Sequence, residues 1–166
     1  MAELTNLESK LGEVVGLAMA AQEAGKQVAK LAREDGNDDV VGTLERMREQ
    51  AQETEERGTA VASSFEGKKT AILEEAREVK SKAQEMMKTY LDEASDTLDG
   101  FEFLTMAEAG EVGHWEILDR LNKRAGNRDV SDLVGWALPI QRQHLETVRS
   151  TSLDLAAEEN PNEVAA

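Results

Sequence analysis

Apolar residues recur along most of the chain in alternating steps of three and four, which is the spacing of one face of an amphipathic helix. This rhythm predicts helices over residues 3–33, 39–65 and 69–98. It also predicts a fourth helix that follows a turn at Asp99-Gly100 and continues to Ala125, and a fifth that starts at Asp129 or Ser131 and runs to Ala157. We therefore expect an all-α protein built from five long helices.

Residues with special backbone preferences mark the expected helix ends. Gly36 and Gly126 can adopt the left-handed conformation that ends a helix, and Asp38 or Asp39 can cap the second helix. Pro139 lies inside the fifth predicted helix and is expected to kink it, because proline cannot donate the backbone hydrogen bond. We assign residues 1–158 to a single helical bundle domain and residues 159–166 to a frayed tail.

The composition narrows the class of protein. A chain of 166 residues with two prolines and 4% aromatic residues is suited to one largely helical domain. The absence of cysteine excludes disulfides and thiolate metal sites. A net charge of −15 disfavours nucleic acid and anionic membranes as partners and favours a cationic or protein partner. Without a signal peptide or an apolar run that could cross a bilayer, we expect a cytoplasmic protein that is not associated with a membrane.

The only two histidines occupy equivalent places in the last two predicted helices. His114 follows Glu111 by three residues, and His144 follows Gln141 by three residues. A step of three puts both side chains of a pair on one helix face, and ferritin-like bundles present metal ligands from such pairs. Both pairs fall on the apolar stripe of their helices, so we expect Glu111, His114, Gln141 and His144 to share one buried layer.

A longer stretch around these pairs resembles a known family. Lys68-Lys69, Phe103-Leu-Thr-Met-Ala-Glu-Ala-Gly-Glu-Val-Gly-His-Trp-Glu-Ile117 and Leu138-Pro-Ile-Gln-Arg-Gln-His144 are similar to segments of the Yci-type, stress-associated branch of the ferritin-like superfamily. The resemblance implies a ferritin-like antiparallel four-helix bundle with one additional helix, usually dimeric, in which carboxylates and histidines hold two metals. On this basis we expect a homodimer.

The sequence departs from that family where its metal ligands would lie. Gly25, Gly113 and Gln141 stand where the family carries glutamate. A site for two irons needs about four carboxylates and two imidazoles from four helices, and the predicted layer offers one carboxylate. Three further glutamates of the first two helices lie away from the predicted apolar faces, namely Glu23, Glu53 and Glu56.

Three interpretations of the layer remain open. The four side chains can satisfy one another by hydrogen bonds and fix the helix register. They can instead bind a single divalent metal (iron, manganese or zinc), with His114, His144 and Glu111 as ligands and Gln141 or water completing the shell. The third interpretation is a working di-iron oxidase.

These interpretations lead to two classes of function. The first is a non-catalytic, ferritin-like protein with a structural, assembly or stress-protective role, and the second is a metal-binding redox protein with a reduced ligand set. In either class, the buried imidazoles should be uncharged, so acidification should weaken the fold.

Overall fold

The computed structural model describes residues 2–165, which contain five helices and no strand. The helices are α1 (Asn6–Glu34), α2 (Asp38–Ser63), α3 (Lys69–Tyr90), α4 (Thr97–Ala125) and α5 (Arg128–Glu158). Residues 159–165 lie outside the helices, and Met1 and Ala166 lie outside the described residues. The prediction of an all-α protein is confirmed. No helix within residues 2–165 has an apolar stretch long enough to span a bilayer.

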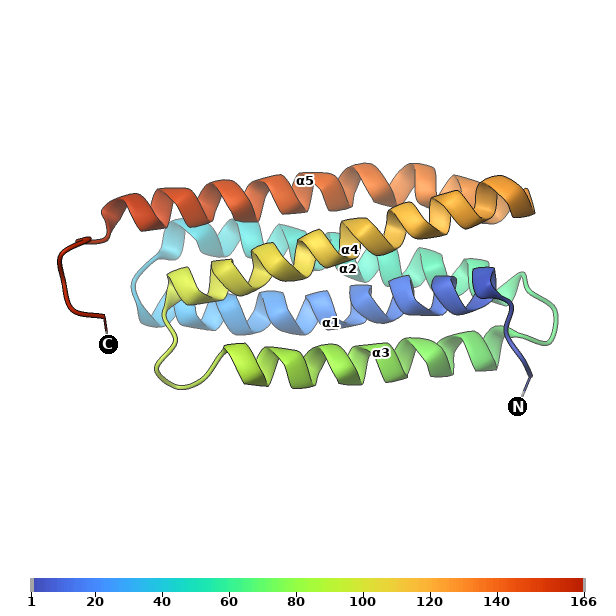
Figure 1. The fold of residues 1–166 in the computed structure, drawn as a ribbon, viewed down its shortest axis with the longest axis horizontal. Coiled ribbons are helices and arrows are strands. Elements are labelled where there is room, and N and C mark those ends of the chain that lie inside the picture. The colour runs from blue at the N-terminus through green and yellow to red at the C-terminus, as the bar shows by residue number, and fades with distance from the viewer. Residues whose placement is uncertain (1, 166) are drawn as a thin grey trace.

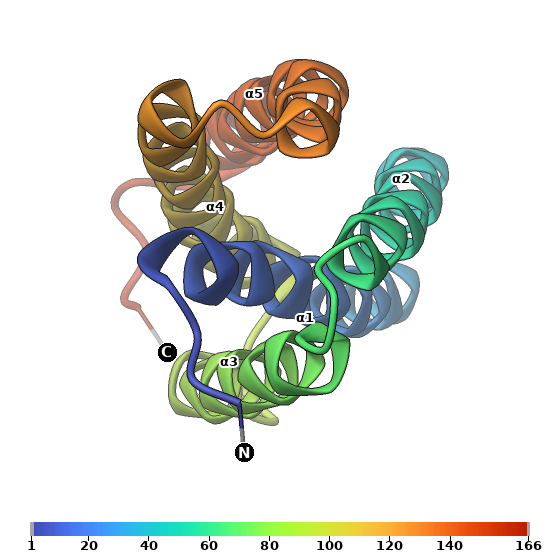
Figure 2. The same cartoon turned by 90° about the vertical axis from the view of Figure 1, so that its right-hand side faces the viewer.

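The helices form two antiparallel pairs and one added helix (Figure 1). α1 packs along α2, and α4 packs along α5. The pairs are joined mainly by α1 against α4, with a smaller contact of α2 with α5. α3 carries the chain back along the bundle and lies on the side of α1 away from α5, as Figure 2 shows in a view along the bundle. α1 is therefore the central helix, with α2, α3 and α4 around it.

The ends of the helices follow local hydrogen bonds. Gly126 ends α4 in the left-handed conformation, with φ 69°, as predicted. The N-cap residues differ from those expected. They are Asn37 for α2 and Asn127 for α5. The side chain of Asn127 accepts a hydrogen bond from Val130 N at 3.0 Å. α5 remains helical through Pro139.

The predicted turn at Asp99-Gly100 is wrong. α3 already ends at Tyr90, and α4 begins at Thr97, so the chain turns within residues 91–96. Asp99 belongs to a capping box, in which its Oδ2 accepts a hydrogen bond from Asp96 N at 2.9 Å while Asp96 Oδ1 accepts one from Asp99 N. Gly100 lies buried inside α4, where an added Cβ would be 2.9 Å from a methyl group of Val28. Asp99 thus stabilises the start of α4, and Gly100 allows α4 to pack closely on α1.

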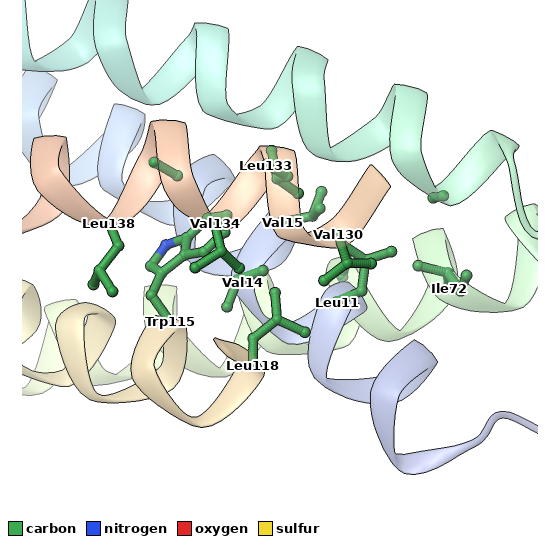
Figure 3. Close-up of a cluster of buried hydrophobic side chains, with 13 residues drawn as sticks. Leu11, Val14, Val15, Ile72, Trp115, Leu118, Val130, Leu133, Val134 and Leu138 are labelled. Atoms are coloured by element: carbon green, nitrogen blue, oxygen red, sulfur yellow. The ribbon is translucent and has the colours of Figure 1, made fainter. Parts of the chain in front are cut away.

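Two apolar clusters fill the bundle, one toward each end. The first, drawn in Figure 3, surrounds Trp115 with residues from α1 to α5: Leu11, Val14, Val15, Ala62, Ile72, Ala76, Leu118, Val130, Leu133, Val134, Ala137 and Leu138. The second comprises Ala24, Val28, Ala29, Leu44, Met47, Leu91, Phe101, Phe103, Leu104 and Val148. In α2, α4 and α5, buried polar residues lie between the segments that form the two clusters.

α3 is anchored over only part of its length. Its buried residues are Ala71, Ile72 and Ala76, all in its first half. Farther along, Met86 and Tyr90 are about half exposed. The first half of α3 therefore holds the helix on α1.

Candidate functional site

Five buried polar side chains form what we call the polar layer, at mid-length of the bundle. They are Thr54 of α2, Glu108 and Glu111 of α4, and Gln141 and His144 of α5, and none is more than 3% exposed. α1 contributes no polar side chain here, and its nearest buried residue is Ala18. The layer interrupts the apolar core, so each of its polar groups needs a partner to offset lost hydration.

The side-chain amide of Gln141 joins the two glutamates. With its nitrogen facing α4, it donates hydrogen bonds to Glu108 Oε2 at 3.1 Å and to Glu111 Oε2 at 3.2 Å. One NH2 group has two donors and can therefore serve both carboxyls at once. The same two contacts place the two Oε2 atoms within about 6 Å of each other, although both belong to acidic groups.

His144 connects the layer to α2. Its Nε2 lies 2.7 Å from Gln50 Oε1, and because that oxygen only accepts, Nε2 carries the proton and donates. The other ring nitrogen, Nδ1, is 3.8 Å from Glu108 Oε2, which is too long for a hydrogen bond. The hydroxyl of Thr54 donates to the backbone oxygen of Gln50 at 2.8 Å. The layer therefore links α2, α4 and α5.

Burial sets the charge of these groups. It raises the pKa of Glu108 to about 8. Burial also raises the pKa of Glu111 well above its usual value, and the neighbouring charge of Glu108 raises it further. Burial lowers the pKa of His144 to about 4. At neutral pH the imidazole is uncharged, and Glu108 favours its protonated form because no cation of the layer compensates its charge.

The prediction that His114 shares this layer is wrong. Its side chain is 40% exposed and faces α1, where Nδ1 lies 3.1 Å from Glu13 Oε2 and 3.2 Å from Lys10 Nζ. The buried face of α4 instead runs through Glu108, Glu111 and Trp115, with a further polar residue, Asn122, one helical repeat later. The bulky indole of Trp115 takes the interior position, which turns His114 toward the edge. Burial of Glu111, Gln141 and His144 was predicted correctly.

Two residues of the site were missed, Glu108 and Gln50. Glu108 lies three residues before Glu111 on the same face, but the neighbouring Ala107 fits an apolar stripe better, so the apolar pattern does not reveal Glu108. Gln50 is partly buried beside the apolar Ala51, and the pattern does not reveal it either. The prediction that Glu23, Glu53 and Glu56 lie away from the core is confirmed, since all three are exposed.

The donors of the layer do not match the two-metal site that the resemblance implies. α1 and α2 supply no carboxylate to it, and Gln141 is neutral. Within residues 2–165, no three His, Asp or Glu side chains are grouped so that they could hold one metal ion. The oxygens nearest each other on Glu108 and Glu111 are instead connected through the Gln141 amide.

Comparisons of the chain with protein-family models, with curated proteins and with solved structures gave no significant match.

Proposed function

We propose that the chain is a non-catalytic, ferritin-like helical bundle protein with a structural, assembly or stress-protective role. The topology supports the ferritin-like part of this proposal. Ferritin-like bundles join two antiparallel helix pairs by one long crossover that returns along the bundle. Here the pairs are α1–α2 and α4–α5, and α3 occupies the place of the crossover (Figure 1).

The observation that carries the non-catalytic part is the position of the Gln141 amide between the two buried carboxyls. An amide that donates to both acids gives each of them a hydrogen-bond partner without a metal ion. Buried polar networks of this kind can fix the relative register of helices, since any shift would leave a buried group unpaired. We propose that this is the role of the polar layer.

A second candidate is a protein that binds one iron, manganese or zinc ion in the same layer, with a redox role. Glu108 favours it, because this residue adds a second carboxylate to Glu111 and His144. The side chains would have to move to reach a common ion, since in their present arrangement they form no three-ligand group. His114 would take no part, because it faces α1.

Metal analysis separates the two candidates. Protein purified without an affinity tag or chelator is expected to carry far less than one iron, manganese or zinc per chain, and Glu111→Gln or His144→Gln should leave this content unchanged. His114→Gln is the matched control, because it removes an imidazole outside the layer. About one metal per chain, lost in Glu111→Gln and retained in His114→Gln, would establish the second candidate.

A further inference from the structure

A cavity of about 540 Å³ lies between α1, α3 and α4. α3 and α4 both pack on α1 but hardly on each other, and Figure 2 shows them on different sides of α1. The volume is within the range of 300–1,000 Å³ that is usual for sites of small organic molecules. The cavity is therefore large enough for a ligand of that kind.

The cavity is lined mainly by apolar side chains and also by two buried acids. Leu17 and Ala21 of α1, Val79 and Ala83 of α3, and Ala107 of α4 contribute to the walls. The side of α4 that faces the cavity also carries Glu108 and Glu111, the two buried acids of the polar layer. The cavity thus combines a hydrocarbon surface with two carboxyl groups at its inner end.

These carboxyls have room for another hydrogen-bond donor. Each accepts from Gln141 through Oε2, and among the hydrogen bonds within residues 2–165 neither uses its Oε1. Neither forms an ion pair with a lysine or arginine in that part of the chain. An acid that is buried, in contact with a cavity and without a cation is a favourable partner for a ligand cation.

Most of the other charged groups that line the cavity are also acidic. Glu13 of α1 and Glu75 of α3 line it, together with a single lysine, Lys82. His114 also lines it and lies against Glu13, which Lys10 pairs with at 2.5 Å. His144 approaches Glu108 from α5, while α2 presents the uncharged Gln50 and Thr54. Acidic groups prevail, so the site attracts cations and repels anions.

We propose that this cavity binds an apolar ammonium compound, with its hydrocarbon part along α1 and α3 and its amino group at Glu108 and Glu111. Burial of the hydrocarbon part supplies the affinity, and the charge-assisted hydrogen bonds to the two carboxyls supply the preference for an amine. A neutral alcohol of the same length gains only the first of these contributions. A carboxylate of that length would place a further anion beside two buried acids, where no cation compensates it.

Binding is coupled to the release of a proton. Burial raises the pKa of Glu108 to about 8, so this carboxyl is mainly protonated at pH 7 before the ligand arrives. An ammonium group beside it stabilises the ionised form, which lowers its pKa and sends the proton to the buffer. The neutral alcohol would not cause this release.

Titration calorimetry at pH 7 with octylamine, octanol and octanoate as probes tests the proposal. We expect octylamine to bind about tenfold or more tightly than octanol, which corresponds to the charge-assisted contacts, and octanoate not to bind. Repeating the octylamine titration in two buffers of different ionisation enthalpy should give a release of up to about one proton per ligand. Equal affinities for amine and alcohol, or no proton release, would overturn the proposal.

Variants locate the site. Glu111→Gln should reduce the octylamine affinity about tenfold and leave that for octanol nearly unchanged. Ala83 of α3 is partly buried and lines the cavity, so Ala83→Phe should fill the cavity and abolish binding of both probes. Ser81→Phe, on the exposed face of the same helix, should leave binding unchanged. Circular dichroism of each variant verifies folding. Unchanged octylamine binding in Ala83→Phe would place the ligand elsewhere.

The same measurements exclude two other occupants. If a second copy of the chain covers the cavity, octylamine will not bind, and Ala83→Phe will dissociate a dimer seen in sedimentation. If a metal ion holds the carboxyls, octylamine will bind only after treatment with a chelator. Either result contradicts the proposal. A covering second copy leaves the proposed function standing, because the register role of the layer does not depend on it, whereas a bound metal ion would favour the second candidate of the proposed function.

Discussion

Glu108 is the single residue at which the fold should respond most clearly to pH. Burial raises its pKa from 4.5 to about 8, so between these values the folded chain keeps a proton that the unfolded chain has released. The contribution of Glu108 to the free energy of unfolding therefore falls as pH rises from 4.5 to 8. His144 acts in the opposite direction, because its pKa is lowered from 6.5 to about 4 and stability rises with pH between these values.

Above pH 6.5 only the carboxyls change charge, so wild-type stability should fall between pH 6.5 and 8. In Glu108→Gln this decline should be smaller, and the variant should be more stable than wild type at pH 8 by about 1–2 kcal/mol, since a buried, uncompensated charge is removed. Thermal unfolding followed by circular dichroism at pH 6.5, 7.2 and 8 measures both effects.

Glu102→Gln is the matched control for this experiment, because Glu102 lies on the exposed face of the same helix. It should reproduce the pH dependence of wild type. A wild-type melting temperature that rises from pH 6.5 to 8 would show that Glu108 is ionised at little cost in the folded state.

The residues of the site also mark the limit of what the sequence could predict. The positions Glu111, Gln141 and His144 were found because they repeat at helical spacing among apolar neighbours. His114 was assigned to the wrong face and Glu108 was missed, because Ala107 and Glu108, like His114 and Trp115, are neighbours, and either member of each pair can continue a stripe at helical spacing. The choice between them depends on where the indole of Trp115 fits, and this is decided by the volumes of residues on other helices.

At the scale of the helices, α1 and α3 approach each other closely at two glycines of α1. An added Cβ on Gly12 would lie 2.7 Å from the backbone oxygen of Ile72, and one on Gly16 would lie 2.3 Å from that of Ala76. A Cβ essentially never lies this close to a non-bonded backbone oxygen, so either substitution must push the two helices apart. The two glycines therefore set the distance at which α3 is held.

Gly16→Ala should destabilise the protein by about 1–3 kcal/mol, because the methyl group meets backbone atoms that cannot turn aside. Gly135→Ala, inside α5 with no atom near the added Cβ, should stabilise it by about 0.5–1 kcal/mol through the higher helix propensity of alanine. Urea unfolding measures both free energies. Similar effects of the two substitutions would mean that α3 is not held at the distance described here.

Helices as elements were predicted well, and their ends less so. Each of the five long apolar stripes corresponds to a helix, because a period of three to four residues is maintained over many turns. The end of α3 was misplaced because Asp-Gly is a frequent turn signal, whereas here Asp99 caps a helix and Gly100 allows close packing on Val28. The packing role of Gly100 depends on α1, which is distant in sequence, so no sequence pattern near Gly100 indicates it.

For the whole molecule, we predict a homodimer. α3 lies outside the two helix pairs, and three large apolar side chains that do not line the cavity remain more than 40% exposed on the helices: Tyr90, Ile117 and Leu153. Covering part of this surface would be favourable at about 25 cal/mol per Å². Sedimentation velocity over a hundredfold range of concentration is expected to show a dimer that dissociates on dilution. A single monomeric species throughout would reject the prediction.

The one-sided anchoring of α3 has a consequence for motion. Its first half is held by the buried residues Ala71, Ile72 and Ala76, whereas residues 77–90, which include the whole second half, contain no fully buried residue, and the next buried side chain is Leu91, directly after the helix. Breaking a small apolar contact costs much less than unfolding the bundle, so this half opens as a local fluctuation while the two helix pairs stay intact. We expect this opening to move Ala83 away from α1, and backbone amides of the second half to exchange with solvent faster than those of the two helix pairs. The second half of α3 is therefore the part of the cavity wall that we expect to move relative to the two helix pairs.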